Sequence, residues 1–265
     1  MRYNYNEGYF RNWSHNMAYI LGYIVADGCV SLSNGSYGLI ISSVDLDTVT
    51  FIKDEICATK NIYHNGDGSH TISFTNKNLI MDIMAHGVIP RKTWAPVVPE
   101  VPIEYWISFI HGLFDGDGSS YIIKLTRDVT IRIGTSISSH NKEFLMIIGN
   151  MIRHLIGNIP KIYPSYLKDR ECYRLMYQVK ESIAFYHMLY DKPNITYFLN
   201  RKKEVYEDWL INIKNDINWG FRLCVQCGKK FVALHDNSNR CWQCRNNNCT
   251  ILNSNQDMIQ NYKKL

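Results

Sequence analysis

The stretch Ala18-Tyr19-Ile20-Leu21-Gly22-Tyr23-Ile24-Val25-Ala26-Asp27-Gly28 has a counterpart in Ser108-Phe109-Ile110-His111-Gly112-Leu113-Phe114-Asp115-Gly116-Asp117-Gly118, 90 positions later. In both copies a small residue recurs at every fourth position, so on a helix the small residues share one face. Most other positions are apolar, which is typical of a buried helix. We therefore expect two buried helices whose backbones approach closely along their small residues.

Both copies end in Asp-Gly, at Asp27-Gly28 and Asp117-Gly118. We expect each glycine to adopt the left-handed conformation that ends many helices. Each aspartate then lies at the negative end of a helix dipole, where a carboxylate is disfavoured. Packing the two helices side by side brings Asp27 and Asp117 together, and like charges so placed favour a divalent cation between them.

This repeat resembles the motif of the LAGLIDADG homing endonucleases, in the form with two motifs on one chain. Leu21–Gly28 and His111–Gly118 cover the core of the motif. The first copy departs from it at Val25, where the second copy keeps Asp115, whereas the last acidic position is present in both. The alternative is a pair of core helices with glycine contacts and incidental aspartates.

The resemblance implies a Mg²⁺-dependent, site-specific endonuclease that hydrolyses both strands of double-stranded DNA. Asp27 and Asp117 would bind the catalytic metal ions, with the backbone carbonyls of Ala26 and Gly116 as further ligands, each aspartate serving one strand. Two basic pairs, Arg91-Lys92 and Arg201-Lys202, follow the predicted sheets of the two halves. The resemblance places Lys92 and Lys202 beside the metals; the alternative for the second pair is a solvated helix face.

Around the two copies the sequence predicts an α+β fold with the order αββαββα in each half, followed by a last helix. The two halves would be pseudo-symmetric, and the family's architecture is a saddle in which two antiparallel sheets flank the paired motif helices. The Pro-rich stretch 96–102 separates the halves. We predict a first half over residues 1–98, a second half over 99–217, and a small C-terminal module with a tail over 218–265. The predicted helices cover 15–27, 45–59, 78–86, 102–117, 139–155, 181–190 and 200–214, and the predicted strands cover 29–33, 37–43, 61–64, 70–75, 120–126, 129–136, 161–167 and 172–179.

Alternation along the strands of the second half separates apolar from polar side chains. One face of each strand carries basic or amide side chains, which suit contacts to base edges in the major groove. Any half-exposed strand alternates in this way, so the pattern alone leaves DNA contact open. The predicted DNA-binding residues are Lys124, Arg132, Arg174 and Gln178.

The C-terminal region contains two Cys-x2-Cys pairs separated by thirteen residues, formed by Cys224 and Cys227 and by Cys241 and Cys244. Four thiolates with this spacing match a tetrahedral structural Zn²⁺ site, in a module that resembles a zinc ribbon or treble-clef finger. Gly228 after the second cysteine suits a tight knuckle turn. A redox role for the cysteines is the alternative.

Composition is consistent with these expectations. The net charge of +5 and the pI of about 8.7 permit a nucleic-acid partner. No apolar run reaches 18 residues and the N-terminus is polar, so we expect no membrane segment and no secretion signal, and a cytoplasmic or organellar location. With both motifs on one chain, the expected state is a monomer on a long asymmetric DNA site. The competing hypothesis is an RNA maturase or a non-cleaving DNA-binding protein on the same fold.

Overall fold

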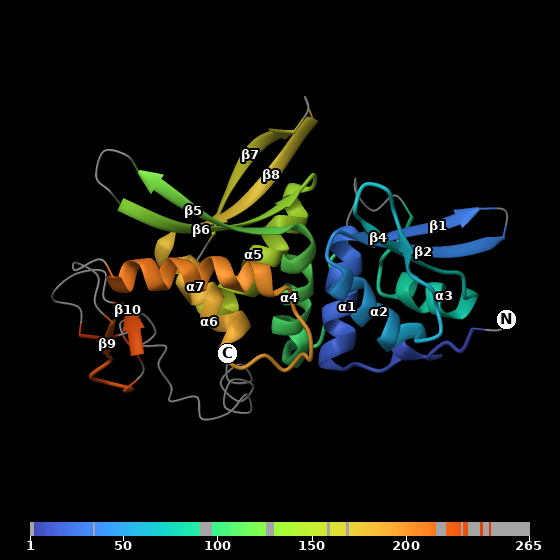
Figure 1. Cartoon of the computed structure of the whole chain (residues 1–265), viewed down its shortest axis with the longest axis horizontal. Coiled ribbons are helices and arrows are strands. Elements are labelled where there is room, and N and C mark those ends of the chain that lie inside the picture. The colour runs from blue at the N-terminus through green and yellow to red at the C-terminus, as the bar shows by residue number, and fades with distance from the viewer. Residues whose placement is uncertain are drawn as a thin grey trace. The chain divides into compact units, whose positions relative to one another are not determined.

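The structure is a computed structural model of the chain (Figure 1). It describes residues 3–33, 35–90, 97–125, 130–157, 160–167, 170–215, 221–228, 230–232, 239–240 and 244. The chain forms two compact units, one made of residues 1–120 and 134–203 and the other of residues 121–133 and 204–265. Both motif copies fall in the first unit. The domain boundaries near residues 98 and 217 stay a prediction.

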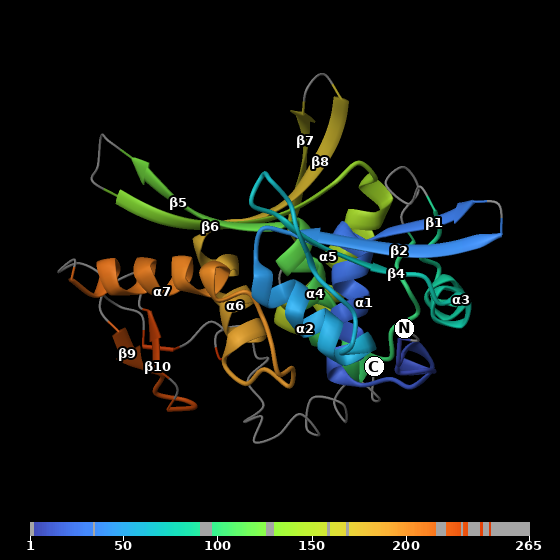
Figure 2. The same cartoon turned by 45° about the vertical axis from the view of Figure 1, so that its right-hand side comes forward.

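The first half follows the predicted order of helices and strands. A short 3-10 helix, Tyr9–Arg11, precedes it. Its elements are α1 (His15–Asp27), β1 (Cys29–Ser33), β2 (Ser36–Ser43), α2 (Leu46–Cys57), β3 (Tyr63–His64), β4 (His70–Phe74) and α3 (Lys77–Ala85). The strands form an antiparallel sheet in the order β1-β2-β4-β3, and α2 and α3 pack against one face of it (Figures 1 and 2). The Ser14 hydroxyl caps α1 by accepting a hydrogen bond from Met17 N–H, at 3.1 Å.

The second half repeats this order. A 3-10 turn, Ile103–Tyr105, occupies the predicted start of the second motif helix, which itself begins at Trp106. The elements are α4 (Trp106–Asp117), β5 (Gly118–Leu125), β6 (Thr130–Ser139), α5 (Lys142–Ile156), β7 (Lys161–Leu167), β8 (Arg170–Tyr177), α6 (Val179–Tyr190) and α7 (Asn200–Asn215). Its sheet has the equivalent order β5-β6-β8-β7. The predicted α+β class and the doubled αββαββα pattern are therefore confirmed.

Helices α1 and α4 lie side by side in both views and form the core of the first unit (Figures 1 and 2). Their glycines make this packing possible, because a methyl group at Gly22 would overlap the carbonyl oxygen of Phe109. In the same way, a methyl group at Gly112 would overlap the carbonyl oxygen of Tyr19. The two contacts are related by the 90-residue offset of the repeat, so the packing is pseudo-symmetric. The prediction of two helices in backbone contact is thus confirmed.

The glycines that follow the motif helices differ from the prediction. Gly28 has φ −70° and Gly118 has φ −87°, so both are extended and neither is left-handed. A side chain is excluded at Gly28 for a steric reason, because its Cβ would lie 2.8 Å from the carbonyl oxygen of Ile24. At Gly118 a Cβ would overlap Phe114 in the same way. The chain therefore leaves each helix directly into a strand, and only glycine fits against the last turn.

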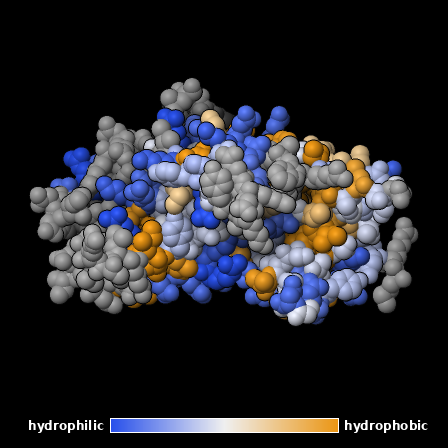
Figure 3. All heavy atoms as spheres, turned by 90° about the horizontal axis from the view of Figure 1, so that it is seen from above, coloured by the Kyte–Doolittle hydropathy of each residue, from blue (hydrophilic) through white to orange (hydrophobic). Residues whose placement is uncertain are grey.

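The sheets are amphipathic. In the first sheet Ile41 pairs with Ile72 on the buried face, and in the second Ile137 pairs with Leu175. Hydrophilic side chains cover much of the described part of the face seen in Figure 3. No helix among the described residues is long and apolar enough to span a lipid bilayer.

Candidate active site

The two motif aspartates occupy equivalent places in the two halves. Asp27 and Asp117 are the last residues of α1 and α4, and both are exposed although the turns before them are buried. Ala26 and Gly116, the residues before them, meet where the helices cross, since a methyl group at Gly116 would overlap the Ala26 side chain. The same methyl group would lie 3.4 Å from Oδ2 of Asp27. The Asp27 carboxylate therefore lies beside the helix end that carries Asp117.

This arrangement fits a hard divalent cation. The carboxylates of Asp27 and Asp117 and the carbonyls at the two helix ends are all oxygen donors, which Mg²⁺ and Ca²⁺ prefer. The exposed aspartates face solvent, so a phosphate can reach them. Ala26 and Gly116, the predicted carbonyl ligands, lie at the crossing itself.

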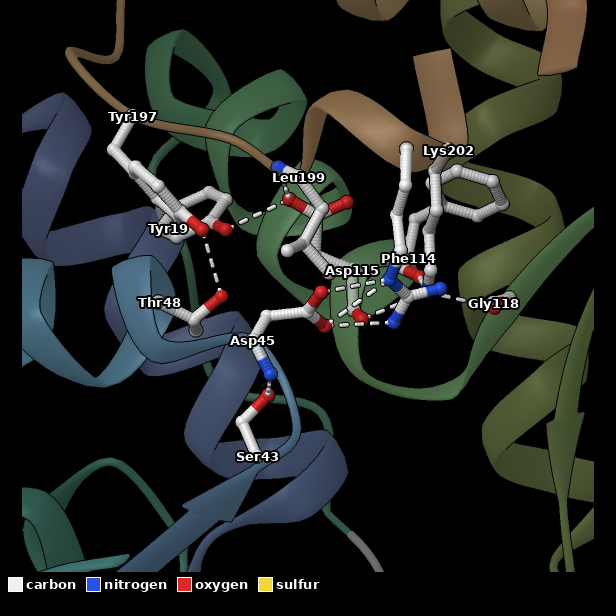
Figure 4. Close-up of polar contacts among 11 residues, drawn as sticks. Tyr19, Ser43, Asp45, Thr48, Phe114, Asp115, Gly118, Tyr197, Leu199 and Lys202 are labelled. Atoms are coloured by element: carbon white, nitrogen blue, oxygen red, sulfur yellow. Dashed lines mark hydrogen bonds and ion pairs between the residues drawn. The ribbon is translucent and has the colours of Figure 1, made fainter. Parts of the chain in front are cut away.

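Lys202 is buried beside the C-terminal turn of α4 and does not extend into solvent (Figure 4). Its Nζ donates to the carbonyl oxygens of Phe114 at 2.6 Å, Asp115 at 2.7 Å and Gly118 at 2.7 Å. Burial lowers the pKa of Lys202 to about 8, while the carboxylates of Asp115, Asp27 and Asp117 act in the opposite direction. The ammonium is thus close enough to both motif aspartates for their charges to interact. The alternative of a solvated helix face is excluded for Lys202.

The earlier acidic residue of the second motif, Asp115, is buried. Its Oδ2 accepts hydrogen bonds from the Tyr19 hydroxyl at 2.7 Å and from Leu199 N–H at 2.9 Å (Figure 4). Burial raises the pKa of Asp115 to about 6, although both hydrogen bonds oppose the rise. The equivalent position in the first motif, Val25, is likewise buried, but its side chain is apolar. Asp115 therefore ties α4 to α1 and to the segment before α7.

His111 lies one turn before Asp115, fully enclosed by aromatic rings. Its ring stacks on that of Phe198, with 5.3 Å between the ring centroids, and meets the Tyr190 ring edge-to-face, with 4.9 Å between the centroids. Burial lowers the pKa of His111 to about 3, with a smaller contribution from the charge of Lys202. The imidazole is neutral at physiological pH and packs as a core residue.

The segment between α6 and α7, residues 191–199, and the first turn of α7 bind the first half. Asn16 on α1 exchanges two hydrogen bonds with Thr196, and Tyr197 OH lies 2.7 Å from the Thr48 hydroxyl on α2. Arg201 forms a bidentate ion pair with Asp45, with Nε–Oδ1 2.9 Å and Nη2–Oδ2 2.8 Å. These contacts hold residues of the second half against the helices of the first.

Of the predicted DNA-contacting residues, two are exposed on strands and one lies just outside a strand. Arg174 is exposed on β8, paired with Ser138 of β6 and Tyr163 of β7, so these side chains share the polar face of the sheet. Arg132 is exposed on β6. Gln178 is also exposed, but it is the residue before α6, because β8 ends at Tyr177. The side chain of Lys124 lies outside the described residues, and so does the whole of Lys92, the basic residue predicted beside a metal ion.

Sequence reasoning missed a polar row on the first sheet. Ser42, Thr71 and Tyr63 are cross-strand partners on the face opposite the buried Ile41 and Ile72. The Ser42 and Thr71 hydroxyls are hydrogen-bonded at 2.7 Å, and Tyr63 is 58% exposed. Only the strand register shows this row, since hydroxyl side chains are too common in exposed strands to stand out in a sequence.

Three of the four predicted zinc ligands come together. The Sγ atoms of Cys224, Cys227 and Cys244 lie within 4.8 Å of one another, whereas Cys241 lies outside the described residues. The first pair lies in the connection between β9 (Phe221–Leu223) and β10 (Lys230–Val232). Gly228 has φ 69° and its N–H donates to Cys224 O at 2.8 Å, which is the expected knuckle turn. Thiolates in a tetrahedral zinc site are about 3.8 Å apart, so small shifts of these three side chains would bring their sulfurs to zinc-binding distances.

Two αββαββα halves, joined along glycine-lined helices that each end in an exposed aspartate, define the two-motif LAGLIDADG homing endonuclease fold. The solved structures that share this fold include three DNA complexes. The meganuclease I-SmaMI bound to uncleavable DNA has a TM-score of 0.54 and 12% identity, covering 78% of this chain and 91% of I-SmaMI. The homing endonuclease I-LtrWI bound to target DNA has a TM-score of 0.52 and 12% identity, covering 79% of this chain and 92% of I-LtrWI. I-DmoI in complex with DNA and Ca has a TM-score of 0.50 and 19% identity, covering 72% of this chain and 96% of I-DmoI.

At these identities the likeness shows the fold alone. The sequence matches no family model. A search of curated proteins found no significant match.

Proposed function

We propose that this protein is a site-specific endonuclease that uses divalent metal ions to hydrolyse both strands of double-stranded DNA. The observation that carries the proposal is the pair of exposed carboxylates, Asp27 and Asp117, at equivalent ends of two helices in backbone contact. The three similar structures are DNA complexes, and one of them contains Ca. Mg²⁺ is the proposed ion. The proposed partner is double-stranded DNA with a long asymmetric site, bound by one chain. The gene for the protein would lie in an intron or a free-standing mobile element.

In this proposal Asp27 and Asp117 hold the metal ions, with the carbonyls of Ala26 and Gly116 as further ligands. Bound divalent ions supply an activated water and stabilise charge on the phosphate. The paired helices fix the two carboxylates relative to each other, so the two strands are cut at a set spacing. Lys92 and Lys202 are the proposed basic residues beside the metals.

The proposed DNA contacts of the second half are Arg174, Arg132, Gln178 and Lys124. In the first half, the polar row of Ser42, Thr71 and Tyr63 is a further proposed contact surface. Arginine and hydroxyl side chains on a sheet suit hydrogen bonds to base edges and phosphates. Cys224, Cys227, Cys241 and Cys244 are proposed to bind one structural Zn²⁺, separate from the oxygen-bound catalytic ions.

The test of the proposed function is the loss of cleavage without the loss of binding. Asp27→Asn and Asp117→Asn remove a metal-binding charge and keep the size of the side chain. Each variant should abolish double-strand cleavage in Mg²⁺ and should bind DNA in Ca²⁺ within about threefold of the parent, a difference below 1 kcal/mol. Asp67→Asn, in an exposed turn of the first half, is the matched control and should cut normally.

The substrate is DNA of the native locus without the inserted element, or a randomised library from which cleaved sites are selected. Full cutting by either motif variant would contradict the assignment. A parent protein that binds such DNA and never cuts it would be a DNA-binding protein, and one that binds and splices its host RNA would be a maturase.

A further inference from the structure

The ammonium of Lys202 and the end of α4 form a local clamp. The three carbonyl oxygens that Lys202 binds belong to Phe114 and Asp115 on one side of Asp117 and to Gly118 on the other. An ammonium has three protons, and here each has a carbonyl acceptor at 2.6 to 2.7 Å. No proton of Lys202 is left to reach a phosphate or a water in this arrangement.

The contacts of Lys202 match what a helix end requires. The last carbonyls of a helix lack partners within the helix and carry partial negative charge, so a cation there is stabilising. Gly118 N–H already donates to Phe114 O, at the cap of α4. Lys202 Nζ donates to the same Phe114 oxygen and also to the carbonyl oxygen of Asp115. These bonds hold in place the helical turn that ends in Asp117.

Lys202 is itself held from several directions. Its own carbonyl oxygen accepts a hydrogen bond from the Ser120 hydroxyl at 3.0 Å, which ties it to the strand that follows Asp117. The preceding Arg201 is paired with Asp45, and Leu199 N–H is bonded to Asp115. The start of α7 is therefore held to α4 through Leu199, to Asp45 of the first half through Arg201, and to β5 through the carbonyl of Lys202.

We propose that Lys202 is a positioning residue for the Asp117 half of the site, acting through the backbone of the α4 terminus and not by direct contact with the substrate. The inference rests on the proposed endonuclease function. It predicts that Lys202 sets the position of Asp117 through these backbone hydrogen bonds, whereas its effect on Asp27, at the end of α1, is limited to the interaction of their charges. Losing Lys202 should therefore make the two strand cuts unequal.

The test compares Lys202→Met with Lys203→Met, which removes the same charge from the adjacent, partly exposed position. Each strand of a DNA substrate carries its own label, and cutting is followed in single turnover at saturating protein. In Lys202→Met the ratio of the two strand rates should change by about tenfold, equivalent to about 1.4 kcal/mol between the two barriers, so that nicked DNA accumulates. Lys203→Met should keep the parental ratio. Lys202→Gln, which retains two N–H donors, should lie between them and covers the case in which Lys202→Met folds poorly.

A second measurement needs no cleavage. Amide hydrogen exchange of the free protein should become about tenfold faster at Gly118 and the end of α4 in Lys202→Met, and should be unchanged at Gly28 and the end of α1. Equal slowing of both strands, or faster exchange at both helix ends, would overturn the proposal in favour of a general structural role. Unchanged exchange with slow cutting would also overturn it, because Lys202 would then act directly on the substrate. If the parent does not cut DNA, the endonuclease proposal fails, while hydrogen exchange still decides whether the clamp exists.

Discussion

At the scale of single residues, His111 lies inside the second copy of the repeated motif and has a structural role. Aromatic rings enclose it, and burial lowers its pKa to about 3. A histidine with a depressed pKa is neutral in the folded protein and binds a proton when the chain unfolds. Its contribution to stability is therefore present above pH 6.5 and is lost as the pH falls from about 6.5 toward 3.

Replacing this imidazole should make the free energy of unfolding depend less on pH below pH 6.5. His111→Met introduces an apolar side chain of similar size that cannot bind a proton. Between pH 6.5 and 4.5 the parent should lose about 2 kcal/mol more unfolding free energy than the variant, because the slope approaches about 1.4 kcal/mol per pH unit only below the pKa of the unfolded histidine. The measurement is urea unfolding at both pH values.

Phe198→Leu is the matched control, because it loosens the same aromatic enclosure without removing a titratable group. It keeps the titratable imidazole, so it should still lose stability more steeply than His111→Met as the pH falls. If parent and His111→Met lost stability in parallel as the pH fell, the imidazole would not be the group that binds the proton.

At the scale of secondary-structure elements, the α1–α4 pair is held by contact between backbones. Gly22 and Gly112 are the positions where this contact leaves no room for a side chain. The packing fixes the positions of the two helix ends, and with them Asp27 and Asp117. A change that separates the helices should therefore affect stability and the site together.

Gly112→Ala tests the helix contact. Alanine favours a helix over glycine by about 1 kcal/mol, so an isolated helix would gain stability from the change. Here the new methyl group meets the carbonyl of Tyr19, and we expect a net loss of about 3 kcal/mol, at the upper end for overpacking. Denaturant unfolding measures this difference.

Gly66→Ala is the control, because a Cβ at Gly66 meets no atom within 4 Å. Its stability should stay within about 0.5 kcal/mol of the parent, as for ordinary surface substitutions. An equal loss in both variants would mean that the backbone contact does not determine the cost.

At the scale of the whole molecule, the chain combines two kinds of candidate metal site. The helix ends offer oxygen donors to a hard cation, whereas Cys224, Cys227 and Cys244 offer sulfur to a soft one. A site with four thiolates has no open position for water, so its role is structural. The two sites should therefore be separable by experiment.

Full-length protein purified without chelator should contain one zinc per chain. Cys224→Ser and Cys244→Ser should lose it, and Cys29→Ser, at an exposed cysteine on β1, should retain it.

Loss of zinc should unfold only the region from about residue 220 onward. It should also weaken DNA binding and make the binding less dependent on salt, because phosphate contacts are lost. Single-turnover cleavage of saturated DNA should survive, and its loss would place the cysteine module in the active site. Metal analysis that found no zinc in the parent would refute the zinc assignment itself.

The sequence by itself determined the elements and their order. Small residues at every fourth position, alternation in the strands and the 90-residue repeat are local or periodic signals, so they survive without knowledge of the contacts. The αββαββα halves, the paired helices and the aspartates at their ends follow from these signals. Element boundaries shifted by a few residues, as at β8, where Gln178 leaves the strand to precede α6.

Only the tertiary structure decided how the helix ends are held. Lys202 binds carbonyls that lie 84 to 88 positions away in the chain, and Arg201 pairs with Asp45 at a separation of 156. Gly28 and Gly118 are required by the approach of a preceding turn and not by a left-handed backbone. Partners so distant in sequence leave no periodic trace, because their pairing depends on which surfaces meet when the two halves pack together.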